Sequence, residues 1–149
     1  MNPLATLYRV PLASPLLKAR FVGRPNRFVV LCGLDGKTVE AYLPNPGRLW
    51  ELLLPGRLLY LVKNPPGSGK SIPYTALAVE REGRPILLHT HLANDVAASL
   101  LAAGRLPGFE QDRVIRREAA AGSSRYDFLL ARGGRDFFLE VKSCTLFDG

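Results

Sequence analysis

The segment Arg125–Lys142 carries the residues whose types and spacing could do chemistry. It reads RYDFLLARGGRDFFLEVK, two hydrophobic-rich runs on either side of Gly133-Gly134. Two glycines between such runs predict a two-residue β-hairpin turn, because a type I′ turn needs a positive φ at both central positions. A hairpin centred on these glycines places Asp127 directly opposite Glu140.

Two carboxylates in that position repel each other, since directly opposed Cβ atoms lie about 4.5–5.5 Å apart and like charges there weaken a hairpin. A divalent cation between Asp127 and Glu140 would turn the repulsion into binding. Carboxylate oxygens are hard ligands that suit Mg²⁺ or Mn²⁺. Lys142 shares a face with Glu140, because side chains two apart on a strand point the same way.

This arrangement predicts metal-dependent hydrolysis of a phosphodiester. A metal held by Asp127 and Glu140 lowers the pKa of its bound water, and Lys142 orients that water or stabilises the developing negative charge. Glu118, on the preceding expected strand, could add a further carboxylate. The alternative is an ordinary charged surface in which Arg125 and Lys142 neutralise the acids, and a one-residue slip of the hairpin would put the acids on opposite faces.

The elements around this hairpin follow a helix-then-strands pattern. Asn94–Ala103 is expected to be a helix, with Asn94 as its N-cap and Gly104 at its end. Three strands are expected after it: Val114–Ala119, Ser124–Ala131 and Asp136–Ser143. We therefore expect an α/β domain over residues 86–149.

Residues 1–85 show a different pattern, of short strands separated by Gly, Pro and Asn. The expected strands are Leu16–Gly23, Arg27–Cys32, Thr38–Leu43, Leu58–Val62 and Tyr74–Val79, with one or two helical turns in Pro46–Leu54. Five short strands with one helical insert favour a small barrel. The OB-fold is the commonest such barrel that binds oligonucleotides, and an SH3-like barrel fits the strand count almost as well.

The net charge of +7 comes from the first of these parts. Residues 1–85 hold 12 Lys and Arg against 5 Asp and Glu, whereas residues 86–149 hold 8 of each. A basic part of this kind attracts polyanions, although a generally basic surface without a partner is the alternative. The candidate phosphate contacts are Arg20, Arg24, Arg27, Arg48, Arg57, Lys63 and Lys70, and the candidate stacking aromatics, which could equally be core residues, are Phe28, Tyr42 and Trp50.

Several classes of protein are excluded by the composition. No stretch approaches the roughly 18 apolar residues of a membrane span. Met1–Arg20 carries three prolines and lacks the pattern of a secretory signal, so we expect a cytoplasmic protein. Cys32 and Cys144 lie far apart, which argues against a disulfide framework or a zinc ribbon and favours two reduced, buried thiols.

Four stretches of the chain resemble the sugar fermentation stimulation protein A (SfsA) family of bacteria and archaea. They are RPNRF (24–28), LPNPGRLWELLLPG (43–56), REAAAGSSRYDFLL (117–130) and FLEVKSCTL (138–146). The resemblance implies an OB-like domain followed by a PD-(D/E)xK nuclease-like domain, and DNA binding linked to the regulation of sugar (maltose) metabolism. It implies that Asp127, Glu140 and Lys142 are the nuclease-type triad with Glu118 as an auxiliary acid, and it singles out Arg24, Arg27 and Arg48.

Two features depart from the family pattern. Pro46 stands where the family usually has Thr in its Asn-x-Gly-Arg motif. Family chains also continue well beyond the Glu-x-Lys strand, so the nuclease-like domain is expected to be truncated here. An open strand edge would result, and a second copy of the chain in a homodimer could cover it.

The sequence therefore predicts an α+β protein with an OB-like barrel over residues 1–85 and a partial PD-(D/E)xK domain over residues 86–149. The leading function is DNA binding, mainly through phosphate contacts, with a Mg²⁺- or Mn²⁺-dependent nuclease-type site. The first alternative is a non-catalytic DNA-binding regulator of sugar metabolism genes that keeps the nuclease fold as a scaffold. The second is a module that binds proteins or polyanions and whose basic charge is incidental.

Overall fold

The structure, a computed structural model, describes Leu12 and residues 14–145. The chain divides into two compact units. One extends to Thr90 and includes Cys144 and Thr145, and the other is His91–Ser143. Among the described residues no helix has both the length and the apolarity needed to cross a membrane.

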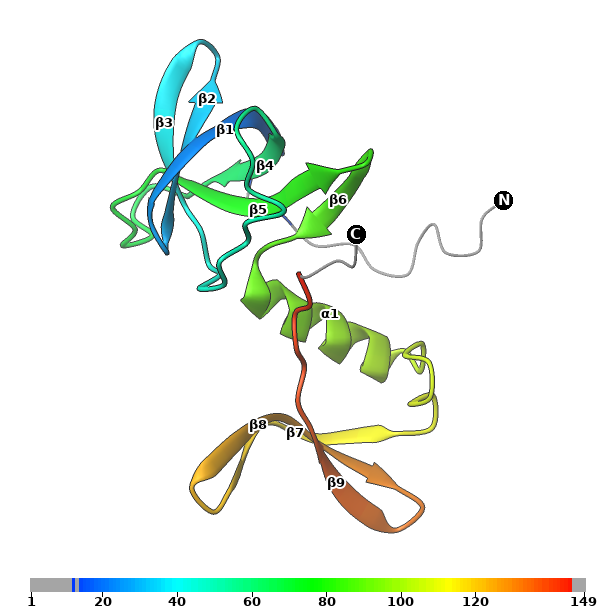
Figure 1. Cartoon of the computed structure of the whole chain (residues 1–149). Coiled ribbons are helices and arrows are strands. Elements are labelled where there is room, and N and C mark those ends of the chain that lie inside the picture. Colours follow the sequence, from blue (N-terminus) through cyan, green and yellow to red (C-terminus); the bar gives the residue numbers. More distant parts are fainter. Residues whose placement is uncertain (1–11, 13, 146–149) are drawn as a thin grey trace. The chain divides into compact units, whose positions relative to one another are not determined.

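The first unit is a β-barrel (Figure 1). Its strands are β1 (Leu17–Asn26), β2 (Val29–Leu34), β3 (Lys37–Tyr42), β4 (Leu58–Lys63), β5 (Tyr74–Arg81) and β6 (Arg84–Leu87). They are ordered β3-β2-β1-β4-β5-β6, and a parallel pairing of β3 with β5 closes the barrel. Strands β1 to β5 thus form the closed five-stranded barrel of an OB-fold, which confirms the expected fold over the SH3-like alternative.

Alternating hydrophobic residues explain how this barrel fills its interior. On β2, Val30, Cys32 and Leu34 are buried while their neighbours are only partly covered, as the two-residue period of a strand requires. The β2–β3 turn is Asp35-Gly36, whose φ angles of 49° and 76° are those of a type I′ hairpin. The barrel core is continuous and includes residues from each of β1 to β5.

Two parts of the barrel differ from the sequence prediction. Strand β6 was not expected, because Pro85 lies inside it; the proline is tolerated since β6 is an edge strand paired only with β5. Residues 46–54 form one turn, closed by the Leu53 N–H donating to the Leu49 carbonyl at 2.9 Å, and not a helix. The turn is irregular because Leu49 has a φ of 56°.

The second unit combines helix α1 (Thr90–Ala102) with the antiparallel strands β7 (Arg113–Ala121), β8 (Ser124–Arg132) and β9 (Arg135–Leu139), ordered β7-β8-β9. The β8–β9 register pairs Ala131 with Asp136 and Leu129 with Phe138, which is the register of a two-residue turn centred on Gly133-Gly134. Gly133 and Gly134 have φ angles of 55° and 78°, the values that a type I′ turn requires. The core of this unit contains Ala97, Leu101, Phe128 and Leu130.

The ends of two elements were predicted wrongly. Helix α1 begins at Thr90 and not at Asn94, so Asn94 lies inside the helix and cannot be its N-cap. Strand β9 ends at Leu139 and not at Ser143, so Glu140 and Lys142 follow the strand.

Candidate functional site

Asp127 lies on β8, and groups from two other segments hold its carboxylate. The Asn94 side-chain amide, from α1, donates to Asp127 Oδ1 at 2.6 Å. The Val141 backbone N–H, just beyond β9, donates to Asp127 Oδ2 at 2.7 Å. The carboxylate is therefore fixed in orientation, because each of its oxygens accepts a hydrogen bond from a different segment.

Glu140 and Lys142 form the second half of this group. Lys142 Nζ donates to Glu140 Oε1 at 2.6 Å. This hydrogen bond and the charge of Glu140, followed by the charge of Asp127, raise the pKa of Lys142 above its ordinary value. Lys142 is consequently protonated at neutral pH, where it can stabilise negative charge but cannot act as a general base.

Glu118 lies outside this group. The pairs Arg117–Phe128 and Ala119–Tyr126 flank it in the β7–β8 ladder, but its φ of 49° departs from strand geometry. Its carboxylate instead pairs with Arg125 at 3.6 Å, and both side chains are 72% exposed. The structure thus brings Asp127, Glu140 and Lys142 together and turns Glu118 toward solvent.

The donor set fits a Mg²⁺-like ion that keeps much of its water. No cluster of three His, Cys, Asp or Glu side chains able to hold a metal ion occurs within the described part of the chain. Mg²⁺ does not need such a cluster, because it usually retains several waters and is bound through one or two carboxylates. Asp127 and Glu140 would supply those two carboxylates.

Sequence reasoning missed the part played by Asn94. Ala97, Ala98 and Leu101 of α1 pack into the core of the second unit, and Asn94 precedes them at the spacing of the same helix face. A polar side chain on the apolar face of a helix needs a partner when it is covered. That signal marks Asn94 as a polar residue in need of a partner, but it does not identify Asp127 as that partner.

On the barrel, Arg24 is used to hold two loops together. Its Nη1 donates to the carbonyls of Gly47 at 2.8 Å and Arg48 at 2.7 Å, and its Nη2 donates to those of Arg27 at 2.7 Å and Asn45 at 3.1 Å. Burial lowers the pKa of Arg24, but the carbonyl oxygens around it favour the charged guanidinium. With four backbone acceptors, Arg24 has little donor capacity left for a phosphate.

Arg27 and Arg48 are exposed, and each lies over an aromatic ring. The Arg27 guanidinium is 5.6 Å from the centre of the Phe28 ring, and the Arg48 guanidinium is 5.4 Å from the centre of the Trp50 ring. Arg27, Arg48 and Trp50 line a hollow of about 320 Å³, together with Arg24 and Pro46. Arg24, Arg27 and Arg48, the three that the motifs singled out, thus share one site.

The remaining basic candidates lie elsewhere on the barrel. Arg20 is exposed and donates at 3.1 Å to the carbonyl of Gly56, the residue before Arg57. Lys63 is exposed at the end of β4. Lys70 lies 6.0 Å from the centre of the Tyr42 ring and lines a separate hollow of about 310 Å³ with it.

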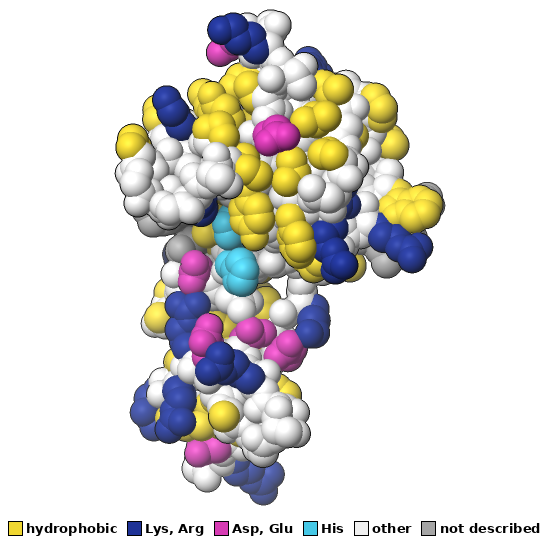
Figure 2. Space-filling view, turned by 90° about the vertical axis from the view of Figure 1, so that its left-hand side faces the viewer, with side chains coloured by type: hydrophobic (Ala, Val, Ile, Leu, Met, Phe, Trp, Pro, Cys, Tyr) yellow, Lys and Arg dark blue, Asp and Glu magenta, His cyan; other side chains and the backbone are white. Residues whose placement is uncertain are grey.

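Side chains of different kinds cover the two units on the face shown in Figure 2. On that face the barrel presents mainly hydrophobic side chains, whereas acidic and basic side chains alternate over the second unit. The basic residues of the barrel are therefore not gathered on this face. Cys32 is buried and Cys144 is exposed, so the expectation of two buried thiols was wrong for Cys144.

Comparison with known proteins places this geometry in a family. A family model of the SfsA N-terminal OB domain matches residues 22–88, and one of the sugar fermentation stimulation protein RE domain matches residues 91–149. The sugar fermentation stimulation protein homolog of Moorella thermoacetica is 41% identical over 141 residues, covering 94% of this chain and 61% of the relative. The homolog of Chloroflexus aurantiacus is 40% identical over 144 residues, covering 95% and 55%.

A solved structure agrees with these matches. The structure of Pyrococcus furiosus SfsA in complex with Ca²⁺ is similar with a TM-score of 0.76 and 31% identity, covering 91% of this chain and 57% of that one. The chain thus spans less than two thirds of the length of these relatives. Because the two family models between them match most of the chain, in the order barrel then helix and sheet, the chain belongs to the sugar fermentation stimulation protein (SfsA) family.

Proposed function

We propose that this chain binds DNA and carries a metal-dependent phosphodiesterase site of the nuclease type. The observation that supports the proposal most strongly is the grouping of Asp127, Glu140 and Lys142: the Val141 N–H, next to Glu140, donates to Asp127 Oδ2 at 2.7 Å, and Lys142 Nζ donates to Glu140 Oε1 at 2.6 Å. Two acids and a protonated lysine within electrostatic reach are a combination suited to a metal ion and a phosphodiester.

In this proposal Asp127 and Glu140 hold Mg²⁺ or Mn²⁺. When bound, the ion supplies an activated water and polarises the phosphate. Asn94 and the Val141 N–H keep the Asp127 carboxylate in place. Lys142, protonated at neutral pH, stabilises the negative charge that develops on the phosphate oxygens.

The Ca²⁺ complex of the Pyrococcus furiosus relative supports a divalent cation as the ligand of this family. Ca²⁺ and Mg²⁺ both prefer oxygen ligands and differ mainly in size and in how readily they lose water. The exposed arginines of the barrel, Arg27 and Arg48, would contact the DNA backbone, which gives affinity without reading sequence.

The test is cleavage of plasmid and single-stranded DNA with Mg²⁺ or Mn²⁺, comparing the native chain with Glu140→Gln and Lys142→Ala. Each substitution is expected to lower the rate by about 10²–10³-fold, the effect of removing one preorganised charge-stabilising group. Asp136→Asn is the matched control, since Asp136 lies on β9 opposite Ala131 and away from the group. The catalytic proposal fails if no cleavage is seen, or if cleavage persists in both variants.

A second candidate is a DNA-binding regulator of sugar metabolism genes that uses the nuclease fold only as a scaffold. It is favoured by the fact that the carboxylates already have partners within the protein. Both Asp127 oxygens accept hydrogen bonds, and Glu140 is paired with Lys142. In that case DNA binding would not require a metal, and Glu140→Gln would leave it unchanged. DNA binding that persists in EDTA in a filter assay, together with no cleavage in Mg²⁺ or Mn²⁺, would identify the second candidate.

A further inference from the structure

We propose that the barrel carries a stacking site for single-stranded DNA, formed by Phe28 and Trp50 with Arg27 and Arg48. The proposal rests on the DNA-binding part of the proposed function but does not depend on cleavage. It adds the class of substrate: a strand whose bases are free to leave their neighbours and lie against aromatic rings.

The first observation is the exposure of two aromatic side chains. Trp50 is 65% exposed and Phe28 is 43% exposed. Exposed aromatic rings that each lie beside an arginine are characteristic of sites where bases stack and phosphates are bound. The Arg27–Phe28 and Arg48–Trp50 distances of 5.6 and 5.4 Å provide two such pairs.

The second observation is that hydrogen bonds between side chains and the backbone fix the loops that present these pairs. Asn45, which is buried, accepts from the Gly47 N–H at 2.9 Å and donates to the Leu88 carbonyl at 3.0 Å. Asn26 accepts from the Phe28 N–H at 2.9 Å. Arg24 then joins the two loops through carbonyls on both of them. The backbone that carries the rings is therefore held in place before any ligand binds, which lowers the entropic cost of binding.

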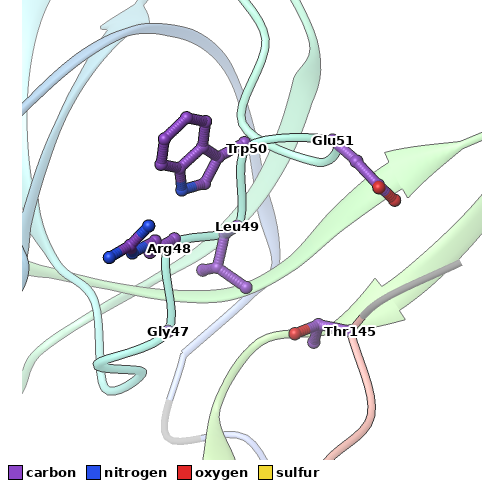
Figure 3. Close-up of a pocket in the computed structure, with 6 residues that line it drawn as sticks. All are labelled: Gly47, Arg48, Leu49, Trp50, Glu51 and Thr145. Atoms are coloured by element: carbon purple, nitrogen blue, oxygen red, sulfur yellow. The ribbon is translucent and has the colours of Figure 1, made fainter.

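The third observation is backbone strain between Arg48 and Trp50. Leu49 has a φ of 56°, a left-handed conformation that is strained for a residue other than glycine. As Figure 3 shows, the Arg48 and Trp50 side chains lie on the same side of the loop, and Glu51 lies on the other. Strain of this kind persists where the surrounding structure imposes it, often at binding sites. Here it accompanies the exposure of a tryptophan, which folding alone would favour burying.

The charge and shape around Trp50 fit a nucleic acid strand. Two hollows, of about 320 and 710 Å³, share Gly47, Arg48 and Trp50 in their lining. Glu51, the acid that lines the larger hollow, is within 3.8 Å of Arg81, which offsets its charge. Bases inside a duplex already stack on each other and cannot offer a face to Trp50, so the site favours single strands over duplex.

The chain contains one tryptophan, which makes a direct test possible. Titration with an oligothymidylate of about ten nucleotides, within the usual site size of an OB-fold, should quench the fluorescence of Trp50 in a saturable manner. An abasic strand with the same number of phosphates and a duplex of equal length are the matched ligands. Equal quenching by the abasic strand would overturn the proposal, and so would tighter binding of the duplex.

Variants identify the residues involved, with affinity measured by anisotropy of a labelled strand. Trp50→Ala should raise the Kd for oligothymidylate by about 5- to 150-fold, which corresponds to about 1–3 kcal/mol per stacked base. Trp50→Phe should restore most of the affinity. Arg84→Ala, which removes an exposed charge of β6 on the same barrel, is the control and should have a small effect that is equal for the abasic strand.

The outcomes separate this proposal from the proposed function. If Trp50→Ala and Phe28→Ala bind the oligothymidylate as tightly as the native chain does, the stacking site is refuted while DNA binding stands. If the native chain binds no DNA at all, the proposed function falls with it. Tighter binding of the matching uridine oligomer would overturn the assignment to DNA. Because both rings are exposed, these substitutions leave the barrel core unchanged, and far-UV circular dichroism verifies this.

Discussion

Replacing Arg24 distinguishes two roles that the same side chain could have. As a phosphate contact, Arg24 would affect DNA binding and its salt dependence but not stability. As the residue that joins the loops at Arg27 and at residues 45–48, it should mainly affect the stability of the barrel. The four carbonyls around its guanidinium favour the second role.

The size of the effect follows from the burial of those bonds. The bonds to Gly47 and Asn45 are partly buried, whereas the bonds to Arg48 and Arg27 are exposed, where water can replace the lost donor. A hydrogen bond to a charged group contributes about 1.5–3 kcal/mol, and less where solvent reaches it. Counting only the two partly buried bonds, Arg24→Ala should lower the free energy of unfolding by about 2–4 kcal/mol. Arg24→Lys should cost about half as much, because an ammonium cannot bridge both loops as the planar guanidinium does.

The assay is urea unfolding followed by Trp50 fluorescence, which reports on the barrel because the chain has a single tryptophan. Arg27→Ala is the matched control: it removes the same charge three residues further along the chain, but its guanidinium is exposed, so the expected change is below about 0.5 kcal/mol. The reasoning is refuted if Arg24→Ala is as stable as Arg27→Ala while the salt slope of DNA binding falls by the value for one lost phosphate contact, about 0.7 on single strands or about 0.9 on duplex DNA.

Three further predictions concern single residues. Glu82 has a φ of 52° in the β5–β6 turn, so Glu82→Asn should stabilise the barrel by about 0.5–1 kcal/mol in the same urea assay, and a loss of stability would contradict this. Burial raises the pKa of the Cys32 thiol to about 11. A thiol reagent at about pH 8 should therefore modify only Cys144 in the native chain, and both cysteines in denaturant. Rapid modification of both cysteines in the native chain would be inconsistent with the burial of Cys32. The hydrogen bond from Arg132 lowers the pKa of Asp112 below its ordinary 3.8. The native chain should therefore be more stable than Asp112→Asn by a full margin at neutral pH, and this margin should decline as the pH falls below 3.8. Thermal unfolding measured across pH tests this, and a margin that stays constant with pH would refute it.

The hairpin at the candidate site could be predicted because its determinants are local. Gly133 and Gly134 alone specify the turn, and the turn fixes every pair along β8 and β9. That register predicts Asp127 opposite Glu140, the first residue of the Glu-x-Lys segment, without any knowledge of the rest of the fold.

The roles of Asn94 and Glu118 could not be read from local sequence in the same way. Asn94 precedes a helical pattern and so resembles an N-cap, but tertiary structure extends the helix back to Thr90 and directs the amide to Asp127. Glu118 occupies a strand position whose left-handed backbone turns its carboxylate toward Arg125. A single non-glycine residue with positive φ inside a strand has no sequence signature.

Arg24 illustrates a third limit. Its motif, Arg-Pro-Asn-Arg, combines two arginines that look equivalent as phosphate ligands, and only the folded barrel distinguishes them. One guanidinium is surrounded by carbonyls from a loop about twenty residues away, and the other lies over Phe28 in solvent. Contacts between distant segments decide which arginine is structural.

The unequal cores of the two units have a consequence for how the chain opens. Among the described residues, 15 buried side chains form the cluster inside the barrel, against four in the helix-and-sheet unit. Local opening is easiest where few apolar contacts are lost. Backbone amides of β7 to β9 should therefore exchange with deuterium before those of β1 to β5. Asp127, Glu140 and Lys142 lie in the faster-exchanging unit, so an ion bound by the two acids would slow exchange there and leave the barrel amides unaffected.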